Sequence, residues 1–404
     1  RRVTDAPRAT DGPADSPASL RTLGRIRVLE ALNQWGRLSR PDLTRRTGLA
    51  RATVGSVIAD LIAAGIVTDH GTSHPGQIQR TGRPARTIGL LPTAAYAVGL
   101  DIGHDHVRCM LCDLGGEPVT DRSVELAVDR EPDQTLACAT ELVAEAIAGM
   151  PRERILGLGV GIASPINPRT GMLRGEAIMP GWVGLRVDDE LAHRTGLTVR
   201  STNDANAGVL GERRYGAARD CADVIYIRLS SGIGAGVVCD GRMLLGSAGL
   251  AGEIGHLPVV EAGTICRCGN RGCLETVASP AAIAELLQPS LGRTVAVDEL
   301  LELTRHDHRG AIRAVQDAGD AVGRALAFTV TLLNPQLIVV GGELEAAGEA
   351  LFTPMRRAIE RYAMRPHAAN LQIVAGALGD SACVRGAAAL ILAQAPERLA
   401  TLSG

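Results

Sequence analysis

A short segment rich in metal-ligand residues constrains this chain more than any other part of its sequence. Three cysteines follow a Cys-x-Cys-x4-Cys spacing and a histidine stands ten residues before the first, the four being His256, Cys266, Cys268 and Cys273. Three thiolates and one imidazole fit a tetrahedral zinc site, and the zinc would be structural because protein ligands fill all four positions. Gly269 and Gly272 allow so short a loop to turn its thiolates inward, since glycine adopts backbone angles closed to other residues.

Length and composition predict a globular protein of two or three domains, with 404 residues of which 46% are hydrophobic. The sequence contains no lysine, which excludes a lysine contact to a nucleotide phosphate and a lysine Schiff base. No apolar run reaches the ~18 residues that a membrane-spanning helix needs, and the N-terminus lacks the hydrophobic segment of a secretory signal. We therefore expect a cytoplasmic protein with no membrane partner.

The charged residues are distributed unevenly along the chain. Residues 20–92 hold 11 arginines and 4 acidic residues, a net charge of +7, whereas residues 1–19 are balanced. Because the whole chain carries −2, everything after residue 92 must carry −9. A basic head on an acidic body predicts an anionic partner for the head alone.

The basic segment has the pattern of a winged helix-turn-helix domain over residues 20–92, and residues 1–19 before it lack apolar periodicity and predict a disordered tail. Apolar residues recur at helical spacing from the start of the segment, and Ser39 is placed to cap a short second helix. A glycine turn and a third helix follow. In the helix-turn-helix plan, Arg51 and Thr53 open this recognition helix, near base edges and phosphates of double-stranded DNA.

Two short apolar stretches, at residues 65–67 and 87–90, would pair as the strands of the wing. The loop between them carries Arg80, Arg83 and Arg86. Arginines on an extended segment with glycine and proline suit a narrow minor groove. The alternative interpretation is a small helical subdomain with a solvated basic face.

Two stretches of the acidic body resemble each other. Residues 97–103 read as a strand that ends in a glycine turn and is followed by a second strand over 107–111, and residues 224–229 run into a glycine-rich turn and another strand. Two such hairpins predict paired α/β lobes with a cleft between them. A further buried strand ends at Gly341 and Gly342. Glycine turns that face one another across a cleft can bind phosphates through their backbone N–H groups.

Together these features resemble the ROK family of sugar kinases and transcriptional repressors, over essentially everything from residue 20 onward. The most specific marks are the cysteine array with Gly-Glu-Ile-Gly-His at 252–256, and then Asn-Asp-Ala-Asn at 203–206. The resemblance implies an α/β fold, in which an N-terminal winged helix-turn-helix precedes a two-lobed actin-like (ribonuclease H-like) core of the sugar-kinase type. The first lobe would comprise residues 93–205 with a C-terminal helix over 380–404, and the second lobe, residues 206–379, would carry the zinc and sugar-binding elements.

The resemblance also implies the residues of a sugar site, namely Asn203, Asp204, Glu253, His256 and Glu275. Carboxylates and an amide suit a polyol, because each can engage two adjacent hydroxyls. In kinases of the family, Asp204 would be the general base that accepts the proton of the attacking hydroxyl. His256 would both ligate zinc and lie near the sugar. The alternatives are that Asp204 caps the helix that follows it and that Glu253 and Glu275 are solvated surface acids.

The nucleotide-binding motifs depart from the kinase pattern. The first phosphate loop keeps Asp101 and Gly103 but continues with His104 and Asp105, and this second carboxylate would repel the phosphates of ATP. The adenosine motif has Glu343 where kinases commonly keep another glycine. These departures predict vestigial nucleotide loops and argue against ATP and Mg²⁺ as cofactors. The residues of these loops are Asp101, Gly103, Ser231, Gly232, Gly234, Gly341 and Gly342, of which the middle three keep the family pattern.

These inferences predict a sugar-responsive DNA-binding regulator, a repressor of carbohydrate-utilisation genes. It would bind a double-stranded operator as a homodimer or homotetramer and take a sugar or sugar phosphate into a kinase-like cleft. One alternative is an ATP-dependent, glucokinase-like sugar kinase that retains a DNA-binding domain. Another is an interaction protein whose head is controlled by a partner protein instead of a sugar.

Overall fold

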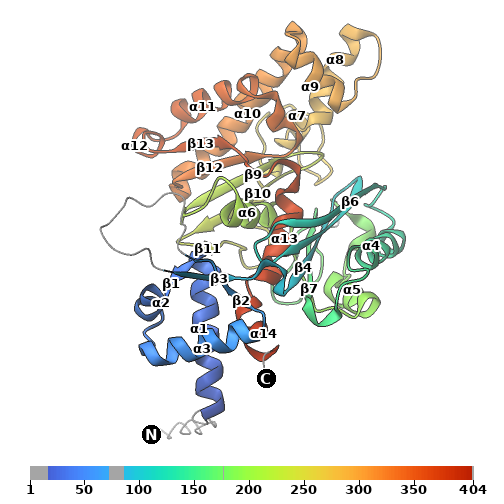
Figure 1. Ribbon diagram of the computed structural model, residues 1–404. Helices are drawn as coiled ribbons and strands as arrows, with labels where there is room; N and C mark the ends of the chain where they lie inside the picture. Colours follow the sequence, from blue (N-terminus) through green and yellow to red (C-terminus); the bar gives the residue numbers. More distant parts are fainter. Residues whose placement is uncertain (1–16, 72–85, 176, 403–404) are drawn as a thin grey trace, which may run out of the picture. The chain divides into compact units, whose positions relative to one another are not determined.

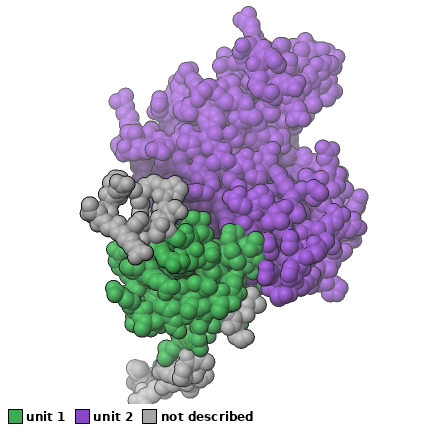
Figure 2. Space-filling model, in the orientation of Figure 1, with its two compact units in different colours: residues 1–95, 393–404 green, residues 96–392 purple. Residues whose placement is uncertain are grey.

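The chain divides into two compact units (Figure 2), the first made of residues 1–95 and 393–404 and the second of residues 96–392. No helix in the described parts of the chain is long and apolar enough to cross a membrane. The computed structural model (Figure 1) describes residues 17–71, 86–175 and 177–402.

The first unit has the order of helices and strands that the sequence predicts for a winged helix-turn-helix. Ser39 caps the second helix by accepting a hydrogen bond from the N–H of Asp42. The sheet order is β1-β3-β2 and both pairings are antiparallel. Leu29, Leu43 and Ile58, one from each of the three helices α1 to α3, are fully buried and form the core of this unit. The described elements are α1 (Pro17–Trp35), β1 (Leu38–Ser39), α2 (Arg40–Thr47), α3 (Arg51–Ala63), β2 (Val67–Asp69), β3 (Thr87–Leu90) and α14 (Ala395–Leu402).

The first lobe of the second unit is a five-stranded mixed sheet covered by helices. The predicted first hairpin is confirmed as β4 and β5, which pair antiparallel, while β4 also runs parallel to β7. Leu136 of α4 (Pro132–Ala146) and Leu191 of α5 (Val187–Thr195) pack in one core with the apolar side chains of β4 and β7. In spatial order the strands are β6 (Pro118–Glu125), β5 (His106–Asp113), β4 (Tyr96–Ile102), β7 (Ile155–Ile162) and β8 (Val199–Asn203).

The second lobe repeats this plan with a second five-stranded sheet, in which the predicted second hairpin is β9 and β10. Its spatial order is β11 (Arg242–Met243), β10 (Ile233–Cys239), β9 (Val224–Leu229), β12 (Leu337–Gly341) and β13 (Gln372–Ala375). Helices cover its apolar face (Figure 1), with Ile225, Ile227 and Leu229 in their shared core. These helices are α7 (Glu275–Ala278), α8 (Pro280–Leu291), α9 (Val297–Arg305), α10 (Arg309–Leu333), α11 (Glu349–Tyr362) and α12 (Arg365–Ala368).

Helices α6 (Asp204–Tyr215) and α13 (Ala382–Leu392) pack on each other between the two sheets. Glycines permit this close approach: a Cβ on Gly99 of β4 would lie 2.1 Å from the carbonyl oxygen of Val384, and one on Gly386 of α13 would lie 1.7 Å from that of Ala207. Helix α6 also contacts β9 and β10. The first turn of α6 is therefore held where the two lobes meet.

The C-terminal segment differs from its prediction. The sequence placed all of residues 380–404 in one helix of the first lobe, but the structure has two helices, α13 in the second unit and α14 in the first. The break precedes Pro396, whose missing N–H is tolerated only in the first turn of a helix. The prediction of a disordered tail over 1–19 lies outside the described residues up to residue 16, and α1 already begins at Pro17.

Candidate functional site

The residues predicted to bind a sugar line one cavity, which we call the sugar pocket. It is formed by the end of β8 and the start of α6, the turn before β10, and the segment from residue 253 to 275. His104 and Gly232 also line it, although the sequence assigned both to nucleotide loops. The predicted residues that line the pocket are Asn203, Asp204, Glu253, His256 and Glu275.

Asn203 caps α6, so the alternative that Asp204 serves as this cap is wrong. The side-chain oxygen of Asn203 accepts hydrogen bonds from the N–H groups of Ala205 and Asn206, at 2.9 and 3.3 Å. This leaves the Asn203 amide NH₂ for a ligand. The Asp204 carboxylate lies at the positive end of the helix dipole, and one oxygen accepts from the N–H of Ala205 at 2.8 Å. The first turn of α6 thus fixes both side chains at the pocket.

Glu275 is a buried and fully engaged carboxylate, not a solvated surface acid. One oxygen accepts from Nε of Arg267 at 2.9 Å, and the other accepts from the backbone N–H of Ile233 at 3.2 Å. Only 8% of the residue is exposed. These contacts tie the segment that carries the cysteines to the turn before β10.

Glu253 is mostly buried in the pocket wall. Burial, and after it the charges of Asp204 and Glu275, raise the pKa of its carboxyl to about 7. Gly252 and Gly255 flank it, and a Cβ on either would lie 2.1 Å or less from a carbonyl oxygen of β10. The glycines of the Gly-Glu-Ile-Gly-His motif therefore let this segment lie directly on the strand.

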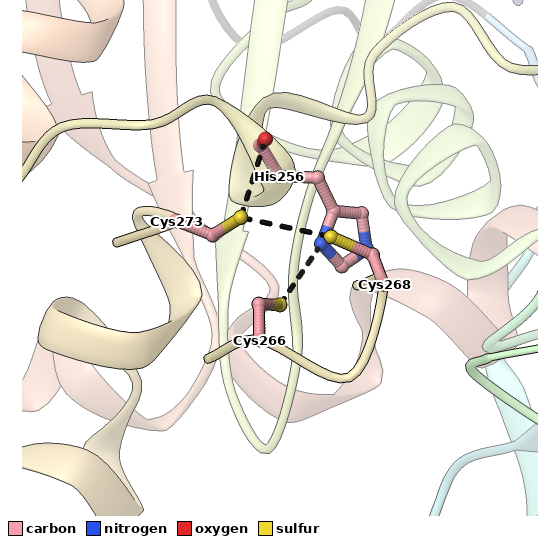
Figure 3. Close-up of side chains that lie close together, drawn as sticks. All are labelled: His256, Cys266, Cys268 and Cys273. Carbon is pink, nitrogen blue, oxygen red and sulfur yellow. Dashed lines mark hydrogen bonds between the residues drawn. The ribbon is translucent and has the colours of Figure 1, made fainter. Parts of the chain in front are cut away.

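The four predicted zinc ligands form one cluster beside the pocket. Figure 3 shows the side chains of His256, Cys266, Cys268 and Cys273 directed toward one another, and their ligand atoms all lie within 4.8 Å of one another. Nδ1 of His256 is 3.6 Å from Sγ of Cys266, and Sγ of Cys268 is 3.6 Å from Sγ of Cys273. Gly269 and Gly272 have φ of 90° and 66°, so both take the left-handed backbone angles that the sequence predicted for them.

The cluster fits a zinc ion. Sulfur atoms that share a tetrahedral zinc with bonds of about 2.3 Å lie about 3.8 Å apart, close to the separation of Cys268 and Cys273. His256 directs Nδ1 to the thiols while its Nε2 is 3.9 Å from a carboxylate oxygen of Glu253. One ring thus reaches both the cluster and the pocket.

A buried group of charges that the sequence did not predict lies next to Asp204. Nη1 of Arg228 is 3.3 Å from one oxygen of Asp204 and 3.6 Å from one oxygen of Asp101, while Nε2 of His106 is 3.5 Å from the same Asp101 oxygen. Burial alone would raise the pKa of Asp101, but Arg228 and His106 outweigh it and lower this pKa to about 2. The hydrogen bonds to Asp101 and Asp105 raise the pKa of His106 to about 9. Burial raises the pKa of the Asp204 carboxyl above its ordinary value, and the charge of Arg228 offsets this rise only in part.

The residues predicted to form nucleotide loops do not all line the same cavity. Asp101 and Gly342 line a second cavity, which we call the nucleotide-side cavity. Gly232 and Gly234 line the sugar pocket instead. Gly103 packs on His106, Gly341 packs on Tyr226, and Ser231 is partly exposed.

The acidic side chains beside the nucleotide-side cavity also differ from expectation. Asp105 is 68% exposed, pairs with His106, and does not line the cavity. Glu343 does line it, and Ser230 donates a hydrogen bond to its carboxylate. His104 does not line this cavity; its Nδ1 lies 2.6 Å from a carboxylate oxygen of Asp129.

The predicted DNA-binding residues lie in the first unit. Arg51 and Thr53 are both exposed in the first turn of α3. Arg86 is exposed at the start of the wing strand and pairs with Asp69 at 3.1 Å. Arg80 and Arg83 lie outside the described residues.

Comparison with known proteins shows the family of this chain, and the similar proteins include both repressors and a glucokinase. A family model described as ROK family matches residues 97–394. A putative xylose repressor of Caldicellulosiruptor sp. is 26% identical, covering 93% of this chain and 96% of its own. The transcriptional repressor Mlc of Escherichia coli is 28% identical, covering 89% and 91%. A glucokinase of Thermotoga maritima is 32% identical, covering 73% and 96%.

The similar solved structures also include a transcriptional regulator and a sugar kinase. A ROK family transcriptional regulator described as a homologue of the E. coli Mlc protein matches with a TM-score of 0.77 and 26% identity, over 95% of this chain and 99% of its own. A ROK family glucokinase from Streptomyces griseus, solved in complex with glucose and AMPPNP, matches with a TM-score of 0.66 and 27% identity, over 73% and 99%.

Proposed function

Because the chain belongs to the ROK family, we propose that it is a sugar-responsive DNA-binding transcriptional regulator that represses carbohydrate-utilisation genes. The relatives named as repressors support this assignment, since their similarity covers 89% and 93% of the chain and so includes most of the first unit. The similarity to the two glucokinases covers only 73% of the chain. In this proposal residues 20–92 are the DNA-binding domain, and residues 93–205 and 206–379 are the lobes of a sugar-sensing body.

The observation that carries the proposal is the convergence of the five polar side chains on one pocket backed by the cysteine cluster. Three carboxylates, an amide and an imidazole present hydrogen-bond acceptors and donors to a polyol. The helix cap on Asn203 and the two contacts of Glu275 hold these groups before a ligand arrives. Preorganisation of this kind lowers the entropic cost of binding.

Zinc bound by His256 and the three cysteines would be structural in this proposal. It would fix the loop that carries Arg267 and thereby the Glu275 carboxylate, and it would fix the ring of His256 at the pocket edge. The chain's own residues then make every contact to the sugar.

The first unit would bind a double-stranded operator through α3. Its exposed Arg51 and Thr53 stand where a recognition helix meets base edges and phosphates. We expect Arg51→Ala to weaken operator binding roughly 5- to 20-fold, the effect of one lost contact to a charged group. Gel-shift titration measures this, with Arg313→Ala on the exposed face of α10 as a control that should leave affinity unchanged. Equal affinity for wild type and Arg51→Ala would reject the placement.

The regulator would act as a homodimer or homotetramer, because paired half-sites of an operator mirror a two-fold axis. Phe328 and Leu332, one turn apart on α10, are 69% and 82% exposed and offer an apolar surface for a second copy. Light scattering of wild type and of a Phe328→Ser, Leu332→Ser variant tests this. A monomeric wild type would contradict it.

A second candidate function is an ATP-dependent sugar kinase, which the similarity to glucokinases and the position of Asp204 favour. Against it, Glu343 adds a further carboxylate to a cavity that already holds Asp101, and carboxylates there would repel the phosphates of ATP. ADP release in the presence of sugar and Mg-ATP would establish the kinase.

The decisive experiment is thermal denaturation of the zinc-loaded protein with a panel of sugars and sugar phosphates, with and without Mg-ATP. A ligand at 100 times its dissociation constant adds about 2.7 kcal/mol to the free energy of unfolding. A shift with one sugar, together with a change in operator affinity caused by that sugar, is the expected result. No shift across the panel would reject the sugar-responsive function and favour control by a partner protein.

A further inference from the structure

Arg228 occupies a position on β9 that neighbouring glycines leave open. Its register partners are Gly234 on β10 and Gly341 on β12. Cross-strand partners point to the same face of a sheet, so no side chain stands beside the guanidinium on either strand. The Arg228 side chain is only 14% exposed.

The guanidinium of Arg228 lies between the sugar pocket and the nucleotide-side cavity. Arg228 and Asp101 line the nucleotide-side cavity, whereas Asp204 lines the sugar pocket. A single nitrogen, Nη1, reaches carboxylate oxygens of both Asp204 and Asp101. These contacts join β9 of the second sheet to β4 of the first sheet and to α6, which packs against α13 between the two sheets.

The contacts of Arg228 are ionic and leave hydrogen-bonding capacity unused. Nη1 makes no hydrogen bond to any described residue, and neither does Oδ1 of Asp101. A guanidinium stays charged when buried and needs an anion close by. Asp101 has a second cation, His106, whereas Arg228 is the cation paired with Asp204 in the described structure. Loss of Arg228 would therefore leave the buried Asp204 carboxylate without its ion-pair partner.

We propose that Arg228 is a positioning residue of the sugar site, which clamps the Asp204 carboxylate in the orientation in which it accepts a hydrogen bond from a sugar hydroxyl. The inference rests on the proposed sugar-sensing function. One oxygen of Asp204 is held by the N–H of Ala205 and the other by Arg228, and each keeps a lone pair for the ligand. A carboxylate that is already held on both oxygens loses little conformational freedom when it accepts a hydrogen bond from a ligand.

The test compares sugar affinity by calorimetry in wild type, Arg228→Met, Asp204→Asn and the double variant. Arg228→Met keeps the length of the side chain and removes its charge. We expect each single variant to lose sugar affinity roughly 10- to 100-fold, the range for a hydrogen bond to a charged group. The double variant should bind sugar no more weakly than whichever single variant has the larger loss of affinity, because both changes remove one shared interaction. Losses that multiply would overturn the proposal.

Two further variants separate positioning from a purely structural role. Arg228→Lys retains a charge and should recover at least part of the affinity lost in Arg228→Met; equal losses would contradict the proposal, and this variant also serves if Arg228→Met does not fold. Arg108→Met removes a partly buried arginine from the same cavity that pairs with Asp121 and not with Asp204. Its sugar affinity should stay within about twofold of wild type.

The outcomes also separate this inference from the proposed function. A wild type that binds no sugar overturns both. A wild type that binds sugar, with Arg228→Met binding equally well, overturns the inference alone.

Discussion

The sugar pocket and the nucleotide-side cavity both hold several charged side chains, but they use them differently. In the sugar pocket, neutral and charged groups are held by the backbone and by the cysteine loop, as Asn203 and Glu275 show. In the nucleotide-side cavity, Asp101 is ion-paired with both His106 and Arg228. The polar groups of the first cavity are therefore held from behind by the backbone and a loop, whereas the charges of the second are paired with one another. In our proposal the first arrangement serves a ligand and the second serves the fold.

The largest expected effect comes from loss of the cluster that supports the sugar pocket. Cys273→Ser replaces a fully buried ligand and should abolish stoichiometric zinc and reduce sugar affinity roughly 100-fold or more, as structural zinc sites determine local folding. Metal analysis and calorimetry measure the two. Cys138→Ser, on α4 and far from the cluster in sequence, is the matched control and should change neither. Full sugar binding by zinc-free protein would show that the cluster does not organise the pocket.

A smaller effect on the same pocket is expected from Glu275→Gln. The amide keeps the shape of the side chain but leaves Arg267 without its ion-pair partner. Sugar affinity should fall roughly 10- to 50-fold, measured by calorimetry. Glu285→Gln, an exposed position on α8, should bind as wild type does. An unchanged affinity for Glu275→Gln would place this carboxylate outside the sugar contacts and their support.

His106 in the nucleotide-side cavity should contribute to stability and not to sugar binding. Because the pKa of His106 is raised to about 9 in the folded protein, its proton stabilises the fold fully below the ordinary histidine pKa near 6.5. That stabilisation is lost as the pH rises through 9, at a cost of roughly 1–2 kcal/mol.

Melting temperatures at pH 6.5 and 9.5, for wild type and His106→Gln, check this. The wild type should lose more stability between these pH values than the variant, because only the wild type releases the His106 proton. Equal losses would contradict the assignment of the effect to His106. Sugar affinity at pH 6.5 should be alike in the two proteins.

The smallest effect is expected at Glu343, a position where kinases of the family commonly keep a glycine. Glu343→Gly removes an acidic side chain from the nucleotide-side cavity and should leave sugar affinity within about twofold of wild type, since its hydrogen-bond partner Ser230 does not line the sugar pocket. Calorimetry with the same sugar measures this. A tenfold change would show that the two cavities are coupled more closely than their contacts indicate.

Much of the fold and part of the site could be predicted from the sequence. The two hairpins and the helix order of the first unit follow from apolar periodicity and glycine turns, which act between near neighbours in the chain. Arg228 was missed because nothing beside it in sequence marks it as functional; its glycine partners Gly234 and Gly341 become its neighbours only in the sheet. The sequence assigned His104 to a nucleotide loop for the same reason. In the structure its ring contacts Asp129 and lines the sugar pocket.

The sequence by itself determined which cysteines meet in one cluster with His256, because cysteines and glycines within one short loop can meet in few ways, and it determined the charge contrast between head and body. Only the tertiary structure decided which carboxylates are free to bind and which are paired. Asp101, Asp204 and Arg228 come from β4, α6 and β9, and their ion pairs form only when both sheets pack against α6 and α13. Electrostatic pairing depends on distances of a few ångströms, and residues a hundred positions apart acquire those distances through packing alone.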